Sequence, residues 1–94
     1  MIEIIIYIKI KKMKFKVYVE DLFFWVNVGQ GYNDFAWLAL VGAKLYSNQK
    51  NPNANYLPCF LEYKYIETDM YVPPHPRTKI YNLFKEPDSP IIKI

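Results

Sequence analysis

A chain of 94 residues is long enough for one domain with one core, and its apolar content of 52% and aromatic content of 18% argue against a disordered chain. The single cysteine, Cys59, excludes an internal disulfide and favours a reducing, intracellular compartment. The net charge is +3, with five lysines between Lys9 and Lys16, but the nearby Glu3, Glu20 and Asp21 favour a solvated strand edge over a phosphate-binding surface.

Residues 1–12 are predicted to form a strand, which we call the N-terminal arm. Isoleucine recurs at every second position from Ile2 to Ile10, and the alternate positions are also partly apolar. The segment lacks a basic start and a cleavage site and is far shorter than the roughly 20 apolar residues of a membrane helix, so we expect no membrane insertion. An exposed strand of this kind needs a partner, in its own chain or another. Its candidate partner-binding residues are Ile4, Ile6 and Ile8.

Residues 14–20 and 23–28 are predicted to pair as a β-hairpin. Phe15, Val17 and Val19 alternate with polar residues, and Phe24, Val26 and Val28 continue the apolar face on the second strand. The other face offers an alternative function, because aromatic rings bordered by lysines stack nucleic-acid bases. With Arg77 as the only arginine and Glu20 and Asp21 nearby, nucleic acid ranks second as a partner. The residues of this alternative face are Tyr18, Phe23, Trp25, Lys14 and Lys16.

After a turn at Gly29-Gln30-Gly31, a helix is predicted to begin at an N-cap, Asn33 or Asp34, and to run to about Asn48. Its core stripe comprises Phe35, Leu38, Val41 and Leu45, with Gly42 allowing close approach to a sheet. The opposite side carries Trp37, Leu40 and Lys44, with Ala36 and Ala43 beside them. One sheet covers only one side of a helix, so these three residues are candidate partner-binding residues. The alternative is that residues 47–55 or the proline-rich segment cover Trp37.

The rest of the chain is predicted as a strand over residues 56–67, whose beginning Pro58 makes an edge or a bulge, followed by a proline-rich connection. Thr78 is expected to cap a short helical turn through residues 80–84, and residues 91–94 form the final strand. Within the connection, the segment VPPHPR fits either a polyproline II ligand for an aromatic groove or a rigid spacer.

This order of elements, together with MKFKVYV at the start of the hairpin and RTKIYNLFKEPDSPIIKI at the end, makes residues 13–94 similar to the ubiquitin-like superfamily. The resemblance implies an α+β, β-grasp fold, with a mixed sheet of four to five strands packed on one helix. The arm lies outside the resemblance and is expected to add an extra N-terminal strand. Because the chain ends in IIKI rather than in a mobile Gly-Gly tail, we expect it not to be a conjugated modifier.

No catalytic constellation stands out. His75 lies in a proline-rich loop, and Cys59 lies between leucines where a small buried residue is ordinary, so we expect neither an enzyme nor a metal or cofactor site. The leading interpretation is a non-enzymatic ubiquitin-like adaptor within a larger protein assembly, bound through the outer helix face and the arm. Composition and the lack of catalytic chemistry make a cytoskeletal or ciliary scaffold one setting.

Overall fold

The computed structural model describes residues 13–53, 61–65, 67–84 and 90–94. The N-terminal arm with Ile4, Ile6 and Ile8, and the predicted strand residues Pro58 and Cys59, lie outside the described residues. The elements, in chain order, are β1 (Met13–Val19), β2 (Leu22–Gly29), α1 (Phe35–Lys50), β3 (Glu62–Lys64), α2 (Ile80–Leu83) and β4 (Ile91–Lys93).

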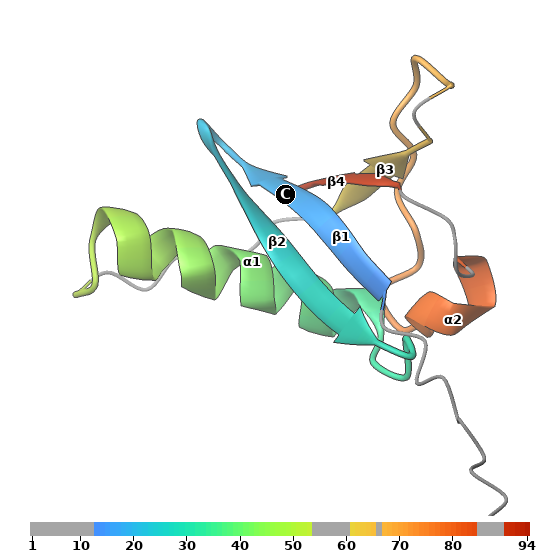
Figure 1. The fold of residues 1–94 in the computed structure, drawn as a ribbon, viewed down its shortest axis with the longest axis horizontal. Helices are drawn as coiled ribbons and strands as arrows, with labels where there is room; N and C mark the ends of the chain where they lie inside the picture. The colour runs from blue at the N-terminus through green and yellow to red at the C-terminus, as the bar shows by residue number, and fades with distance from the viewer. Residues whose placement is uncertain (1–12, 54–60, 66, 85–89) are drawn as a thin grey trace, which may run out of the picture.

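The fold is α+β, with a mixed sheet of four strands in the order β2-β1-β4-β3 and one main helix on one side of it (Figure 1). β1 and β4 pair in parallel at the centre of the sheet, and β2 and β3 are added at the two sides in antiparallel register. The middle of the sheet therefore joins the first described strand to the last. Among the described residues, no helix is both long and apolar enough to cross a membrane.

The hairpin of β1 and β2 confirms the alternation predicted from the sequence. Phe15, Val17 and Val19 are buried, as are Val26 and Val28, because they point toward the helix. Val19 pairs with Leu22, so only Glu20 and Asp21 connect the two strands, and Glu20 adopts the left-handed conformation at φ 52°. Period-two patterning and a short turn were sufficient to define this unit.

α1 begins at the N-cap Asp34, one of the two residues predicted for that role. The Asp34 side chain accepts a hydrogen bond of 2.9 Å from the Trp37 amide. Two earlier amides of the helix are satisfied by the proline-rich connection, since Phe35 donates to the Thr78 carbonyl and Ala36 to the Pro76 carbonyl. The helix ends at Lys50, two residues beyond the predicted end.

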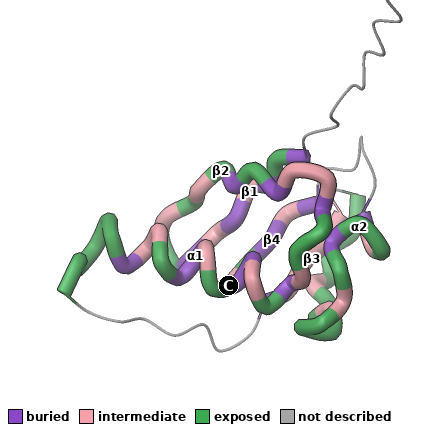
Figure 2. Tube along the Cα trace, turned by 90° about the horizontal axis from the view of Figure 1, so that it is seen from below, coloured by how far each residue is buried: buried purple, intermediate pink, exposed green. Residues whose placement is uncertain are grey.

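The buried side of α1 differs in part from the predicted core stripe (Figure 2). Phe35, Leu38 and Gly42 are buried as expected, whereas Val41 and Leu45 are only partly buried. Ala43, which the sequence placed beside the outer side, is only 3% exposed, and Ala39 is buried as well. The prediction for Ala43 was wrong because small residues let the backbone approach the sheet, which turns the buried side toward the alanines.

α2 is a single short turn, and its predicted cap is also corrected. Lys79, not Thr78, occupies the N-cap position, and its side chain makes no capping hydrogen bond. The first amides of α2 are satisfied by backbone instead, because Ile80 donates to the Asn33 carbonyl and Tyr81 to the Gly31 carbonyl. The turn before α1 therefore determines where α2 begins.

β3 is shorter than the strand predicted over residues 56–67. Within the described part of that range, strand pairing is confined to Glu62–Lys64. On its outer edge, Tyr63 exchanges two backbone hydrogen bonds with Val72, of 2.9 and 2.8 Å. This bridge holds the segment before the prolines against the sheet.

Candidate functional site

The outer side of α1 carries the predicted helix residues, and the structure separates them. Leu40 is 55% exposed and Lys44 is exposed, on the side of the helix away from the sheet. Trp37 is half-buried and packs against the core cluster, so only part of its ring is available. We call Trp37, Leu40 and Lys44 the helix face.

The surface of the sheet opposite α1 gathers a larger set of side chains, which we call the sheet face. Cross-strand pairing places its residues in rows, because paired residues in neighbouring strands point to the same side. The first row is Phe23, Tyr18, Lys93 and Glu62; the second is Trp25, Lys16, Ile91 and Lys64; the third is Asn27 and Lys14. All five residues of the alternative nucleic-acid site therefore lie on one continuous surface.

Two aromatic rings stand out on the sheet face. Trp25 is 64% exposed and Phe23 is 49% exposed, both on the edge strand β2. The ammonium group of Lys16 lies 4.2 Å from the Phe23 ring centroid and 5.1 Å from that of Tyr18. The rings of Tyr18 and Phe23 are 5.8 Å apart. The lysine that sequence spacing placed beside these rings is thus in contact with two of them.

The sequence analysis missed the other half of the sheet face. The ammonium groups of Lys64 and Lys93 lie 5.6 and 5.3 Å from the Tyr71 ring centroid. Period-two alternation in the last strand could have placed Lys93 on the face opposite the buried Ile92. No local signal joins that strand to β1, however. Tyr71 comes from the proline-rich connection, and its position depends on the neighbouring bridge between Val72 and Tyr63.

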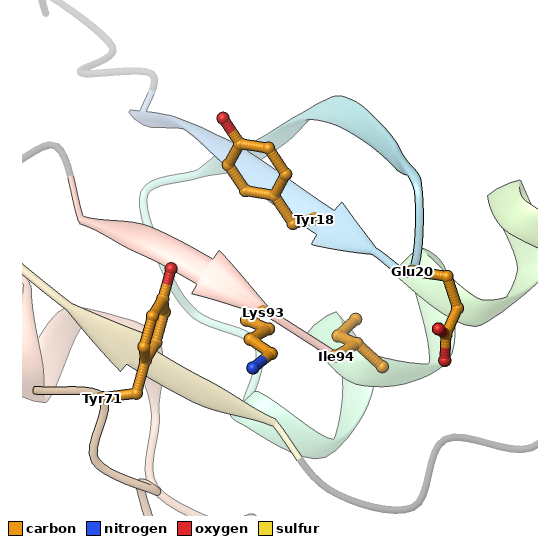
Figure 3. A pocket seen from close by; sticks show the side chains of 5 residues that line it. All are labelled: Tyr18, Glu20, Tyr71, Lys93 and Ile94. Atoms are coloured by element: carbon orange, nitrogen blue, oxygen red, sulfur yellow. The ribbon is translucent and has the colours of Figure 1, made fainter.

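An open pocket of about 340 Å³ lies at one end of the sheet face (Figure 3). β1 contributes Tyr18, β4 contributes Lys93, and the segment before the prolines contributes Tyr71; Glu20 and Ile94 complete the lining. Because the pocket holds one lysine, one glutamate and two tyrosine hydroxyls, it offers both donors and acceptors beside aromatic surface.

The charges of the described residues are mostly unpaired on this face. An ion pair joins the ammonium of Lys50 to Asp21 at 2.8 Å, at the hairpin turn rather than on the sheet face. The hydrogen bond from Lys50 holds the pKa of Asp21 below its ordinary value. Asp21, one of the two acidic residues that argued against nucleic-acid binding, is therefore neutralised by its ion pair with Lys50.

His75 takes part in the local hydrogen bonds of the proline-rich connection. Nδ1 of the exposed His75 accepts a hydrogen bond from the Arg77 amide at 3.1 Å, and the His75 carbonyl accepts one from the Thr78 amide. In the described ranges, no group of three or more histidine, cysteine, aspartate or glutamate side chains is placed to hold a metal ion. The carbonyls of Pro76 and Thr78 accept hydrogen bonds from the first amides of α1, so this part of the connection is attached to the helix. This attachment favours the interpretation of VPPHPR as a rigid spacer over that as a polyproline II ligand.

Comparisons with protein-family models, with curated proteins and with solved structures found no match to this chain.

Proposed function

We propose that this protein is a non-enzymatic, ubiquitin-like subunit of a larger protein assembly. A β-grasp fold is supported by the parallel pairing of β1 with β4 at the centre, by the hairpin of β1 and β2 at one side, and by α1 following that hairpin directly. The fold itself carries no activity, so the function depends on what its surfaces bind.

The observation that carries this proposal is the exposed Leu40 on the helix face. α1 buries its opposite side against the sheet, and Leu40 stays 55% exposed one turn away from the partly exposed ring of Trp37. A single exposed leucine is ordinary, but a leucine beside a tryptophan and a lysine has the composition of a partner-binding anchor. The helix face is therefore the surface that we assign to a protein partner.

The N-terminal arm supplies the second contact in this proposal, through Ile4, Ile6 and Ile8. An apolar strand of this length adds to the edge of a sheet, where backbone hydrogen bonds give affinity and alternate side chains give specificity. The compartment that we propose is intracellular and reducing, because the chain has a single cysteine. A cytoskeletal or ciliary scaffold is the setting that composition and the lack of a catalytic constellation in the sequence favour.

The test compares two substitutions that each replace a large exposed apolar side chain by a glutamate. Tagged full-length protein, Leu40→Glu and Trp25→Glu are used to capture partners from the native source, and the bound proteins are quantified by mass spectrometry. We expect Leu40→Glu to lower the recovery of a stoichiometric partner by about tenfold or more, since a buried anchor is worth about 2 kcal/mol or more. Trp25→Glu changes a residue on the other side of the sheet, so this variant should still recover the partner.

A third variant separates loss of binding from loss of fold. Leu38 is fully buried, so Leu38→Ala should lower the free energy of unfolding by roughly 2–5 kcal/mol, whereas Leu40→Glu should leave it nearly unchanged. If Leu40→Glu unfolds the isolated protein as severely as Leu38→Ala, Leu40 belongs to the core and the helix face is not an interface. Equal recovery of every partner by Leu40→Glu and by the unmodified protein would also contradict the proposal.

A further inference from the structure

The sheet face differs from the helix face in chemistry. Four lysines, Lys14, Lys16, Lys64 and Lys93, lie on it together with three aromatic residues of β1 and β2 and with Tyr71. Among the described residues none of these lysines forms an ion pair, although Glu62 is the cross-strand neighbour of Lys93 and Glu20 borders the pocket. The face therefore carries an excess of positive charge beside exposed rings.

Lys64 and Lys93 show how strongly this charge is concentrated. Both ammonium groups lie within 5.6 Å of the same Tyr71 ring, so two like charges share one aromatic surface. Lys64 also donates to the Thr68 carbonyl at 3.3 Å, which leaves the net charge of the pair unchanged. An anionic group placed between the two ammoniums would reduce their repulsion.

The rings are spaced for bases that are not stacked on one another. Phe23 and Trp25 are two residues apart on one strand, which separates them by about 6.6–6.8 Å along β2. That is about twice the 3.4 Å rise per nucleotide of a strand in duplex DNA. A base on each ring thus requires an extended single strand, whose unstacked bases are free to pack on aromatic side chains.

We propose that the sheet face binds single-stranded nucleic acid, with bases stacked on Trp25 and Phe23 and phosphates contacted by Lys14, Lys16, Lys64 and Lys93. Lys16 already lies over one face of the Phe23 ring, so a base stacks on the other face and the ammonium contacts the phosphate of the same nucleotide. The bound nucleic acid runs from Trp25 in the second row to Phe23 in the first row, and then toward the pocket formed by Tyr18, Tyr71 and Lys93. This inference concerns the side of the sheet away from the helix face and goes beyond the proposed function.

The first test measures affinity and its salt dependence. The full chain is titrated into a fluorescent oligothymidylate or oligouridylate of about 12 nucleotides at several salt concentrations, and the anisotropy is recorded. Four phosphate contacts predict a slope of log K against log salt of about −2.8, since each contact on a single strand contributes about −0.7. A duplex of the same length should bind more weakly. Equal binding of the duplex, or no salt-dependent binding at all, would overturn the proposal.

The second test assigns the lysines with a matched control. Lys64→Gln combined with Lys93→Gln should reduce the size of the slope by about 1.4, the contribution of two phosphate contacts. Lys44→Gln removes the same type of charge from the helix face and should leave the slope unchanged. If Lys44→Gln weakens binding as much as Lys93→Gln alone, the attraction depends only on the net charge of the protein, and the sheet face is not a binding site.

The third test isolates the stacking contribution. Trp25→Ala should weaken binding by about fivefold or more, because a base stacked on an aromatic ring commonly contributes that much. Since Trp25 is exposed, the circular dichroism spectrum of this variant should match that of the unmodified protein. In a Trp37→Phe background, Trp25 is the only tryptophan, and the oligonucleotide should quench its fluorescence.

An unchanged affinity of Trp25→Ala, or equal binding of polyglutamate in competition, would identify the face as a surface for acidic polypeptides instead. Leu40→Glu should keep its oligonucleotide binding, which separates this outcome from that of the proposed function.

Discussion

Gly42 shows how one residue brings the helix against the sheet. A Cβ atom at this position would collide with Cδ1 of Ile94 and would lie 3.2 Å from Cγ1 of Val17. Ile94 can move the end of its side chain, but Val17 is fully buried and its β-branched side chain has few alternative rotamers. The close approach therefore depends on the absence of a side chain.

We predict that Gly42→Ala destabilises the protein, although alanine is the better helix former by about 1 kcal/mol. Forcing a methyl group into this packed contact costs about 1–3 kcal/mol, so the free energy of unfolding should fall by about 1 kcal/mol. Urea denaturation measures the change. The pair Lys44→Gly and Lys44→Ala, at an exposed position in the same helix, measures the propensity contribution alone. A more stable Gly42→Ala variant would show that Val17 has room to adjust.

At the scale of elements, local patterns predicted the parts that depend on neighbours in sequence. The hairpin and the N-cap Asp34 followed from period-two alternation and from one carboxylate at a helix start. The start of α2 could not be predicted from local patterns, because the carbonyls of Gly31 and Asn33, which are distant in sequence, accept hydrogen bonds from its first amides. The five sequence-predicted residues of the sheet face are adjacent in one hairpin, whereas Lys64, Tyr71 and Lys93 join them only through β3 and β4. Tertiary pairing supplied that half of the candidate site.

Phe84, the residue after α2, holds the short helix in the core. Its ring lies 5.0 Å from that of Tyr63 and 5.4 Å from that of Phe15, both in edge-to-face geometry, and it also contacts Phe35. We predict that Phe84→Ala lowers the free energy of unfolding by about 3–5 kcal/mol, the usual cost of removing a fully buried phenylalanine. Phe23→Ala removes the same atoms from an exposed site and should cost about 1 kcal/mol or less in the same denaturation experiment. Similar costs for the two variants would contradict this account of the core.

The contact between Asp21 and Lys50 links the hairpin turn to the last turn of α1. The pKa of Asp21 is lowered in the folded protein, chiefly by the hydrogen bond from Lys50, so the folded state binds the proton less readily than the unfolded state. This stabilisation is fully present above the ordinary carboxyl pKa of 3.8 and is lost as the pH falls through the lowered value. Because the side chains of Asp21 and Lys50 are 64% and 40% exposed, salt should weaken this stabilisation.

We therefore predict that a carboxyl titration followed by nuclear magnetic resonance gives Asp21 a midpoint below 3.8. Lys50→Gln should return the midpoint toward the ordinary value, because it removes the principal cause of the shift. The stability difference between Asp21→Asn and the unmodified protein should be small at neutral pH and should disappear in strong acid. A midpoint that Lys50→Gln does not change would show that the contact is not populated in solution.

At the scale of the whole molecule, the two candidate surfaces lie on opposite sides of the layer formed by α1 and the sheet (Figure 1). Neither Leu40 nor Trp25 belongs to the described core cluster or packs against it, so their substitutions should act independently. We predict that the combined effect of Leu40→Glu and Trp25→Ala on either binding reaction equals the sum of the separate effects, within about 0.5 kcal/mol. Isothermal titration of the double variant measures this sum, and a larger deviation would indicate that one surface influences the other through the sheet.

The two edges of the sheet are unequal, and this difference limits how copies of the chain can join. Tyr63 on β3 is already bonded to Val72, while β2 presents its outer backbone along eight residues. Two copies that pair β2 with β2 about a twofold axis would each use the same edge, so the combined sheet would have both of its ends bounded by a β3 strand. Association of the described strands by this route is self-terminating: it closes at a symmetric dimer, because the outer edge of β3 is already bonded to Val72.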